Sequence, residues 1–314
     1  MSTFLGFDIG TSSIKALLVD EKQNIVAEAN IPVSISRPYP LWSEQDPEEW
    51  WQACLAAVAS LRQTSPSGFQ QLKAIGLSGQ QHGAVFLDGE GRVLRPAILW
   101  NDGRSGLEGR ELGASVPNFL ARASNLPMAG FTAPKVLWVR KHEPEVFKAT
   151  RKVLLPKDYI RFRLSGAYVA EMSDAGGTLW HDVAARKWDD ILLAASGIDR
   201  SYVADLVEGS DPSAMVSDTL SREWGLTPGS VTIAGGAGDN AAAAVGIGAV
   251  SAGQGILSMG TSGVIFGVTD RVIAKPERGL HAMCHALPGR WHGMSVMLSA
   301  ASALSWYAEI IGAS

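Results

Sequence analysis

Two stretches of this chain share one hydrophobic pattern: an apolar run, a Gly-Thr-Ser turn and a second apolar run. The first extends from Phe4 to Val19 and turns at 10–12; the second extends from Gly255 to Val268 and turns at 260–262. Apolar runs on both sides of a short, glycine-containing turn are typical of a β-hairpin. The pattern therefore predicts two similar hairpins, about 250 residues apart.

Both turns carry groups that bind anions. Gly10 and Gly260 allow backbone N–H groups to approach a phosphate closely, and Thr11, Ser12 and Thr261 add hydroxyl donors. Two such turns in one chain suggest a duplicated fold that holds a polyphosphate from both sides. The alternative is that both are ordinary hairpins whose turns contain common turn residues. If only one hairpin were present, this alternative would be favoured.

The two hairpins differ at one position that matters for metal binding. The first carries the carboxylate of Asp8 where the second has Ser258. Mg²⁺ in proteins usually takes one or two carboxylates and keeps several waters. One acidic residue beside two phosphate-binding turns therefore predicts a magnesium–nucleotide site.

The pattern between the hairpins alternates short apolar runs with helical periodicity. A helix is expected after Asp46, with Asp46 as its N-cap, Pro47 at its first position and Glu49 completing a capping box. Strands are expected at 25–33, 72–77, 84–87, 153–155 and 231–234, with a functional loop at 156–159 and an alanine-rich helix from 241. This succession predicts an α/β fold with a mixed sheet flanked by helices.

Asp239 follows the last of these strands and opens the alanine-rich helix. Residues 236–241 match the dinucleotide pattern G-x-G-x-x-A, but a carboxylate at the pyrophosphate position would repel it, and no acidic residue follows before Asp270. A helix N-terminus favours the ionised form of a carboxylate, which suits a base that accepts a hydroxyl proton. A plain N-cap explains Asp239 equally well.

Two loops carry groups suited to a sugar. Gln81 and His82 follow a strand within a loop rich in glycine and amides, and Trp100 precedes the polar residues Asn101 and Asp102. Sugars need many neutral hydrogen-bonding groups beside an apolar wall. The alternatives are a structural histidine and an Asn-Asp-Gly turn. His281, His285 and His292 have no evident fourth ligand, so we do not expect a metal there.

Composition narrows the class of protein. The 314 residues are 46% hydrophobic and 18% charged, which predicts a sizeable core and little disorder. A net charge of −4 without a Lys/Arg run argues against nucleic acid and anionic membranes as partners. Two cysteines and no signal-peptide pattern suggest the cytoplasm.

The longest uncharged stretch is residues 240–269. Seven glycines and several hydroxyl side chains make it a poor helix in lipid, so we expect buried core there and no membrane span. Glycine density rises at 246–251, which predicts a domain boundary, with one domain at 1–245 and the beginning of a second at 246–314. The second part is much shorter than the first, so its copy of the fold is expected to be incomplete.

These residues resemble a known family. The run from Asp8 to Lys15 is similar to the first phosphate motif of the FGGY carbohydrate kinases, a branch of the actin, Hsp70 and sugar kinase superfamily, and 260–262 resembles the second. The stretches 41–47, 97–104, 130–135, 154–159, 173–178 and 284–288 are also typical. Within the family the strongest likeness is to the enzymes that phosphorylate xylulose, although Gln81 stands where methionine is frequent.

The resemblance implies a ribonuclease-H-like fold, a sugar-binding N-terminal domain and an ATP-binding C-terminal domain. It implies that Asp239 is the general base, that Asp8 organises Mg²⁺, and that Gln81 and His82 bind the sugar, with Trp100 and Asp102 beside them. ATP would contact Gly10, Thr11, Ser12, Lys15, Gly260 and Thr261.

The function expected from this resemblance is ATP-dependent phosphorylation of D-xylulose at its terminal hydroxyl, giving D-xylulose 5-phosphate. The alternatives are a kinase of another pentulose or polyol, or a truncated relative that binds sugar without transferring phosphate. We expect the 314 residues alone to bind xylulose with little kinase activity, and the part after about 250 to be partly disordered or to self-associate. A homodimer is compatible with these expectations.

Overall fold

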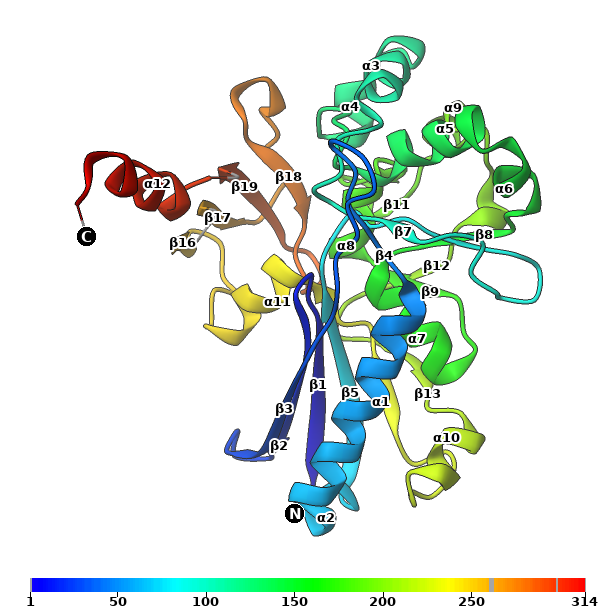
Figure 1. The fold of residues 1–314 in the computed structure, drawn as a ribbon, viewed down its shortest axis with the longest axis vertical. Coiled ribbons are helices and arrows are strands. Elements are labelled where there is room, and N and C mark those ends of the chain that lie inside the picture. Colours follow the sequence, from blue (N-terminus) through cyan, green and yellow to red (C-terminus); the bar gives the residue numbers. More distant parts are fainter. Residues whose placement is uncertain (1, 260–262, 298, 314) are drawn as a thin grey trace.

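The computed structural model describes residues 2–259, 263–297 and 299–313, and its centre is a mixed seven-stranded sheet (Figure 1). Its main order is β13-β14-β5-β1-β2-β3, and β15 pairs with β5. The strands are β1 (Thr3–Ile9), β2 (Ser13–Asp20), β3 (Ile25–Pro32), β5 (Leu72–Gly79), β13 (Pro212–Met215), β14 (Thr232–Ala234) and β15 (Ala237–Gly238). β5 runs parallel to β1, β14 and β15, and the remaining pairs are antiparallel. The predicted mixed sheet is confirmed.

The first predicted hairpin is formed by β1 and β2, with Asp8 directly opposite Lys15. Its buried positions alternate with exposed ones, so one face of the sheet packs on α1 (Pro47–Thr64) and the other faces outward. The predicted helix face that begins with Trp50 and ends with Leu61 is buried.

The start of α1 confirms one predicted cap and corrects another. Asp46 accepts a hydrogen bond from the N–H of Glu48 at 2.9 Å, as an N-cap does. Glu49 does not complete a capping box, because its carboxylate accepts from the N–H of Ser34 at 2.8 Å. The side chain therefore ties the helix to the chain after β3, a long-range contact that local sequence does not encode.

Further helices follow α1 along the chain. They are α2 (Pro66–Phe69), α3 (Gly106–Ser115), α4 (Phe119–Ala123), α5 (Thr132–His142), α6 (Pro144–Ala149), α7 (Pro156–Ser165), α8 (Met172–Ala175), α9 (Asp190–Ala195), α10 (Asp218–Glu223) and α11 (Asp239–Gly246), with 3-10 turns at Gly176–Thr178, Arg200–Tyr202 and Pro276–Arg278. The expected loop at 156–159 is wrong, because these residues form the first turn of α7. Pro156 occupies the first helical position, where its missing N–H is tolerated.

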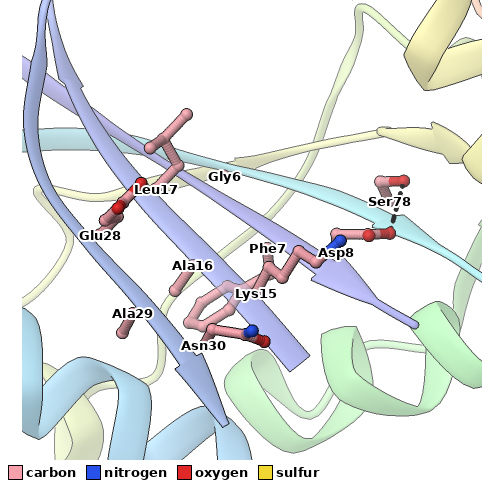
Figure 2. Close-up of a pocket in the computed structure, with 10 residues that line it drawn as sticks. All are labelled: Gly6, Phe7, Asp8, Lys15, Ala16, Leu17, Glu28, Ala29, Asn30 and Ser78. Carbon is pink, nitrogen blue, oxygen red and sulfur yellow. Dashed lines mark hydrogen bonds between the residues drawn. The ribbon is translucent and has the colours of Figure 1, made fainter. Parts of the chain in front are cut away.

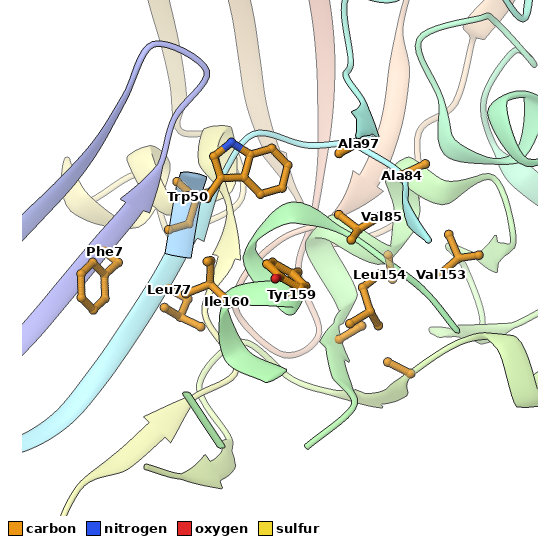
Figure 3. Packing of buried hydrophobic residues seen from close by; sticks show 14 of the residues in the cluster. Phe7, Trp50, Leu77, Ala84, Val85, Ala97, Val153, Leu154, Tyr159 and Ile160 are labelled. Carbon is orange, nitrogen blue, oxygen red and sulfur yellow. The ribbon is translucent and has the colours of Figure 1, made fainter. Parts of the chain in front are cut away.

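Four short strand pairs join the loops that carry these helices. They are β4 (Glu44–Gln45) with β7 (Ala97–Ile98), β6 (Val85–Leu87) with β8 (Lys152–Leu154), β9 (Val169–Glu171) with β12 (Asp205–Val207), and β10 (His181–Asp182) with β11 (Lys187–Trp188). Large side chains fill the space between them and the main sheet, and Figure 3 shows Trp50, Leu77, Val85 and Tyr159 in this core.

A second, antiparallel sheet follows α11. Its order is β16-β17-β19-β18, from β16 (Gly255–Met259), β17 (Gly263–Thr269), β19 (Trp291–Met297) and β18 (His281–Cys284), and α12 (Ala301–Ile311) comes after it. β16 and β17 are the strands of the second predicted hairpin, which is confirmed, while its turn at 260–262 lies outside the described residues. The domain division at 245/246 stays a prediction.

The uncharged stretch 240–269 is not the buried core that its composition suggested. Ile247, Leu257 and Ile265 are each more than 60% exposed, and α12 also exposes Leu304 and Trp306. Figure 1 shows α12 projecting beyond the second sheet. Among the described residues, no helix has the length and apolar character needed to cross a membrane. The expected self-association of this part stays a prediction.

Candidate active site

Asp8 lies near the carboxyl end of β1, at the edge of an open pocket of about 690 Å³. The pocket covers the outward face of β1, β2 and β3, and Lys15, Glu28, Asn30 and Ser78 also line it. Ser78 donates to Asp8 Oδ1 at 3.2 Å, and Figure 2 shows the exposed side chain of Lys15 extending along the sheet toward Asp8. The first hairpin thus presents one carboxylate and one amine on the same face.

Asp239 is brought to Asp8 by the parallel pairing of β15 with β5. Ala237 and Gly238 pair with Ser78 and Gly79, and β1 pairs with the same end of β5, so Asp239 begins α11 across β5 from the end of β1. The N-cap interpretation is wrong, because Gly238 is the N-cap residue and Asp239 is the first residue of the helix. Its Oδ1 accepts from the N–H of Asn240 at 2.7 Å and from the Asn240 side chain at 3.0 Å.

The sequence predicts that the helix N-terminus sets the pKa of Asp239 and favours its ionised form, and the structure differs from this prediction. Burial, aided by the neighbouring charge of Asp8, raises the pKa of Asp239 to about 6, and the hydrogen bonds from Asn240 only partly oppose it. The carboxyl group is still mainly ionised at neutral pH. A pKa close to the working pH makes a carboxylate a better proton acceptor than an ordinary surface aspartate.

A hydrogen-bonded chain joins the first phosphate turn to the predicted sugar-binding loops. The Trp100 indole N–H donates to Thr11 Oγ1 at 3.0 Å, and Thr11 Oγ1 donates to Gln80 Oε1 at 3.2 Å. Gln45 accepts from the Gln80 side chain at 3.0 Å and donates to the carbonyl of Thr11 at 2.8 Å. The hydroxyl of Thr11 therefore links the turn to Trp100, while the exposed Ser12 lies at the tip.

Gly10 has a steric reason to be glycine. A Cβ placed there would lie 2.8 Å from the carbonyl oxygen of Ser13, closer than such contacts occur. The turn is therefore tight enough to need glycine. Gly260 and Thr261 lie outside the described residues, so their part in a phosphate site stays a prediction.

His82 sits in the loop after β5 with a left-handed backbone (φ 67°). Its Nδ1 lies 3.0 Å from the carbonyl of Gly177, and its ring packs on Phe131 with centroids 4.6 Å apart. Burial, together with the nearby charge of Lys135, lowers the pKa of His82 to about 3. The imidazole is neutral at physiological pH, which suits hydrogen bonding to a neutral polyol.

Gln81 is buried between the two halves of the site. Its amide nitrogen lies 3.7 Å from Met283 Sδ on β18, and a Cβ on Gly238 would come within 2.7 Å of the same nitrogen. The structure thus brings Gln81 against the residue that precedes Asp239. It also brings β18, from the second sheet, to the predicted sugar loop.

The carboxylate of Asp102 is buried and accepts hydrogen bonds from groups of the protein itself. Its oxygens accept from both Nε and Nη2 of Arg104, the latter at 2.7 Å, and from the N–H of Ser43 at 2.6 Å. Arg104 in turn stacks over Trp42, with 3.5 Å between the guanidinium carbon and the ring centroid. These bonds give Asp102 a structural role in shaping the loop, and a direct contact with sugar stays a prediction.

The comparisons with known proteins agree with this geometry. Residues 3–246 match the N-terminal domain of the FGGY family of carbohydrate kinases. The chain belongs to this family.

Relatives of this FGGY chain include proteins named xylulose kinase. The one from Escherichia coli (strain K12) is 50% identical over 311 residues, which cover 99% of this chain and 63% of the relative. The one from Klebsiella pneumoniae is 49% identical over 309 residues, which cover 98% of this chain and 63% of the relative. A crystal structure described as a "xyloylose kinase" from Brucella ovis has 52% identity and a TM-score of 0.97, covering 99% of this chain and 64% of that one. The chain therefore spans just under two thirds of the length of these relatives.

Several residues around the candidate site escaped sequence reasoning. Phe131, Thr132 and Lys135 surround His82, and His281 and Met283 on β18 approach the same loop. The run Gly130–Lys135 carried a family signal, but nothing local linked it to His82. The contacts of β18 join residues about 200 positions apart, a distance that only the fold closes.

The acidic groups fit the demands of magnesium. Among the described residues, no group of three or more His, Cys, Asp or Glu side chains could enclose a metal ion. Asp8 is half-buried, with one oxygen bonded to Ser78 and the charge of Asp239 close by. Asp8 can thus offer a carboxylate oxygen, and Mg²⁺ usually takes one or two carboxylates together with waters and phosphate oxygens.

Proposed function

We propose that this chain provides the sugar site and the general base of a kinase that transfers the γ-phosphate of ATP to the terminal hydroxyl of D-xylulose. Asp239 accepts the hydroxyl proton, the freed oxygen attacks the γ-phosphorus, and ADP leaves with the electron pair of the broken P–O bond. The product is D-xylulose 5-phosphate. The names and high identity of the relatives support this choice of sugar.

The observation that carries the proposal is the junction of β15 and α11. It brings Asp239, with a pKa raised to about 6, within electrostatic reach of Asp8, and it sets the preceding residue, Gly238, against the Gln81 side chain. Phosphoryl transfer depends mainly on positioning and electrostatics. A base, a metal carboxylate and a sugar loop within one junction supply these needs.

The remaining roles follow the same geometry. Gln81 and neutral His82 bind sugar hydroxyls, Trp100 forms the wall, and Gly10, Thr11, Ser12 and Lys15 face the nucleotide phosphates. Asp8 would hold Mg²⁺, which, when bound, neutralises charge on the phosphate oxygens. We place the reaction in the cytoplasm, a choice supported by two free, buried cysteines, Cys54 and Cys284.

The test is an assay of sugar-dependent ADP release by the protein with its whole natural chain. D-xylulose should be preferred over D-ribulose, L-xylulose, D-gluconate and glycerol, and the product should carry phosphate on its terminal carbon by NMR. Preference for another of these sugars would replace xylulose but keep the kinase. Thermal stabilisation by xylulose without ADP release would replace the kinase with a binding protein.

A further inference from the structure

The turn at 234–238 immediately precedes Asp239, and the backbone of other segments packs tightly against it. A Cβ on Gly235 would lie 2.1 Å from the carbonyl oxygen of Glu208, and one on Gly236, whose φ is 76°, would lie 2.1 Å from that of Leu77. Such distances leave no room for any side chain. The backbone path of the turn therefore depends on the hydrogen bonds that its own carbonyl and N–H groups make.

Arg161 of α7 fixes the first half of this turn. Its side chain is fully buried, and its guanidinium donates to the carbonyls of Ala234 at 2.6 Å and Gly235 at 2.5 Å. It also donates to the carbonyl of Val169 at 3.2 Å. A planar fork that spans two successive carbonyls constrains their direction in a way that a lysine ammonium cannot.

Ser173 of α8 fixes the second half. Its hydroxyl oxygen accepts from the N–H of Gly238 at 3.0 Å, and its proton goes to Glu171 Oε1, also at 3.0 Å. Glu171 accepts as well from the N–H groups of Ser173 at 2.6 Å and Asp174 at 2.9 Å. The hydroxyl is thus oriented with its lone pair toward the residue before Asp239.

Both residues belong to one buried charged cluster. Lys157 Nζ contacts Asp158 at 2.8 Å, Asp174 at 2.9 Å and Glu171 at 3.4 Å, and Arg161 lies 3.7 Å from Asp158. Two cations and three carboxylates would leave one excess negative charge if all were ionised. Burial raises the pKa of Asp174 to about 8, so a proton retained there balances the cluster at neutral pH.

We propose that Arg161 and Ser173 are positioning residues that act on Asp239 through the turn at 234–238. Neither residue touches substrate; together they set the direction in which the carboxylate faces the sugar hydroxyl. The cluster around Lys157 serves as their rigid base, since groups that are fully buried and mutually bonded cannot shift singly. The inference rests on the proposed role of Asp239 as the base.

The test compares Ser173→Ala with a matched control, Ser196→Ala. Ser196 is equally buried, and its hydroxyl accepts from the Trp180 indole N–H at 2.9 Å, away from the turn. Ser196 also donates to the carbonyl of Leu192 at 3.3 Å, so each variant loses two buried hydrogen bonds, and the two should lose similar stability. In the protein with its whole natural chain, Ser173→Ala should lower kcat about 10- to 100-fold with KM values little changed, because small misplacements of reacting groups have effects of that size. Ser196→Ala should keep the kcat of the parent.

Two further measurements separate positioning from general damage. Ser173→Ala should speed hydrogen exchange at the Gly238 amide and move the titration of the Asp239 carboxyl away from about 6, seen by NMR in the 314-residue chain. Arg161→Lys, which keeps the charge but not the fork, should reproduce the loss of kcat.

The outcomes are distinct. Normal kcat in a folded Ser173→Ala, or equal losses in the two serine variants, overturns the proposal. Failure of both Ser173→Ala and Arg161→Lys to fold also overturns it, because the contacts would then be requirements of the fold alone. A parent protein that does not phosphorylate any sugar overturns the proposed function, and the exchange and titration results then decide the positioning effect by themselves.

Discussion

Lys135 donates a hydrogen bond from Nζ to the backbone carbonyl of His82 at 2.7 Å, and that residue has a left-handed backbone. The same ammonium donates to the carbonyl of Gly130 at 2.8 Å, and Thr132 Oγ1 also donates to His82 at 3.1 Å. Lys135 is fully buried, and burial lowers its pKa to about 7. A buried lysine whose hydrogen bonds go to backbone carbonyls indicates that it holds the His82 loop in place.

Replacing Lys135 with Met should weaken sugar binding by releasing this loop. The loss of a buried donor to a carbonyl typically costs about 1–3 kcal/mol, which corresponds to about 5- to 150-fold in affinity if all of it appears in binding. Calorimetry with xylulose measures it. Lys141→Met in the same helix, where the side chain is 47% exposed, is the control and should bind like the parent. Equal affinity in the two variants would contradict a loop-holding role.

Asp239→Ala should abolish phosphoryl transfer and leave the fold intact. Since Gly238 and not Asp239 is the N-cap, the variant should lose less than the roughly 1 kcal/mol of a removed cap. ADP release and thermal unfolding check the two effects. Asp218→Ala removes an aspartate from the same helical position of α10 and should leave activity unchanged. Near-normal turnover by Asp239→Ala would refute the assignment of the base.

The rate of transfer should depend on pH through Asp239. The base must be unprotonated, so kcat/KM, which reports the free enzyme, should fall as pH drops through about 6 and level off above it. Asp8 raises the pKa of Asp239, so Asp8→Asn should move the titration of the Asp239 carboxyl to lower pH. NMR of that carboxyl without metal measures the shift directly. A titration that stays in place would show that Asp8 does not act on Asp239.

Asp8→Asn should also weaken turnover by raising the Mg²⁺ concentration needed for half-maximal rate. The change removes the carboxylate of the first phosphate hairpin, while sugar affinity should change little. Glu28→Gln is a matched control, because Glu28 lines the same pocket on the neighbouring part of the sheet. A magnesium titration that is identical in Asp8→Asn and the parent would exclude the metal role.

His82→Ala should weaken xylulose binding more than nucleotide binding. The His82 ring packs on Phe131 and bonds to Gly177, whereas it is Gln80 of the same loop that bonds to Thr11 in the turn at 10–12. The loss should be on the order of 1–3 kcal/mol, as for other removed hydrogen-bond partners. His142→Ala, at a side chain 45% exposed, serves as the control. Unchanged xylulose affinity in His82→Ala would return the histidine to a purely structural role.

The sequence by itself determined the local elements and the chemistry-bearing positions. Alternating apolar residues specified the first hairpin, because its one buried sheet face leaves the strands no other register, and the apolar runs of the second pattern predicted β16 and β17. Asp46 and Pro47 specified the start of α1 through the unpaired N–H groups of a helix end. The run after the strand at Thr232–Ala234 marked Asp239, and the family motif marked Asp8, before any neighbour of either was known.

Only the tertiary structure decided what these positions touch. Pairing of β15 with β5 brings Asp239 to Asp8, and the burial that results, not the helix dipole, sets its pKa. Packing turned the expected loop at 156–159 into α7 and left much of 240–269 exposed. Local pattern encodes conformation, but burial and charge coupling depend on residues distant in sequence, and the contact of Gln81 with Met283 exists only when the chain is folded.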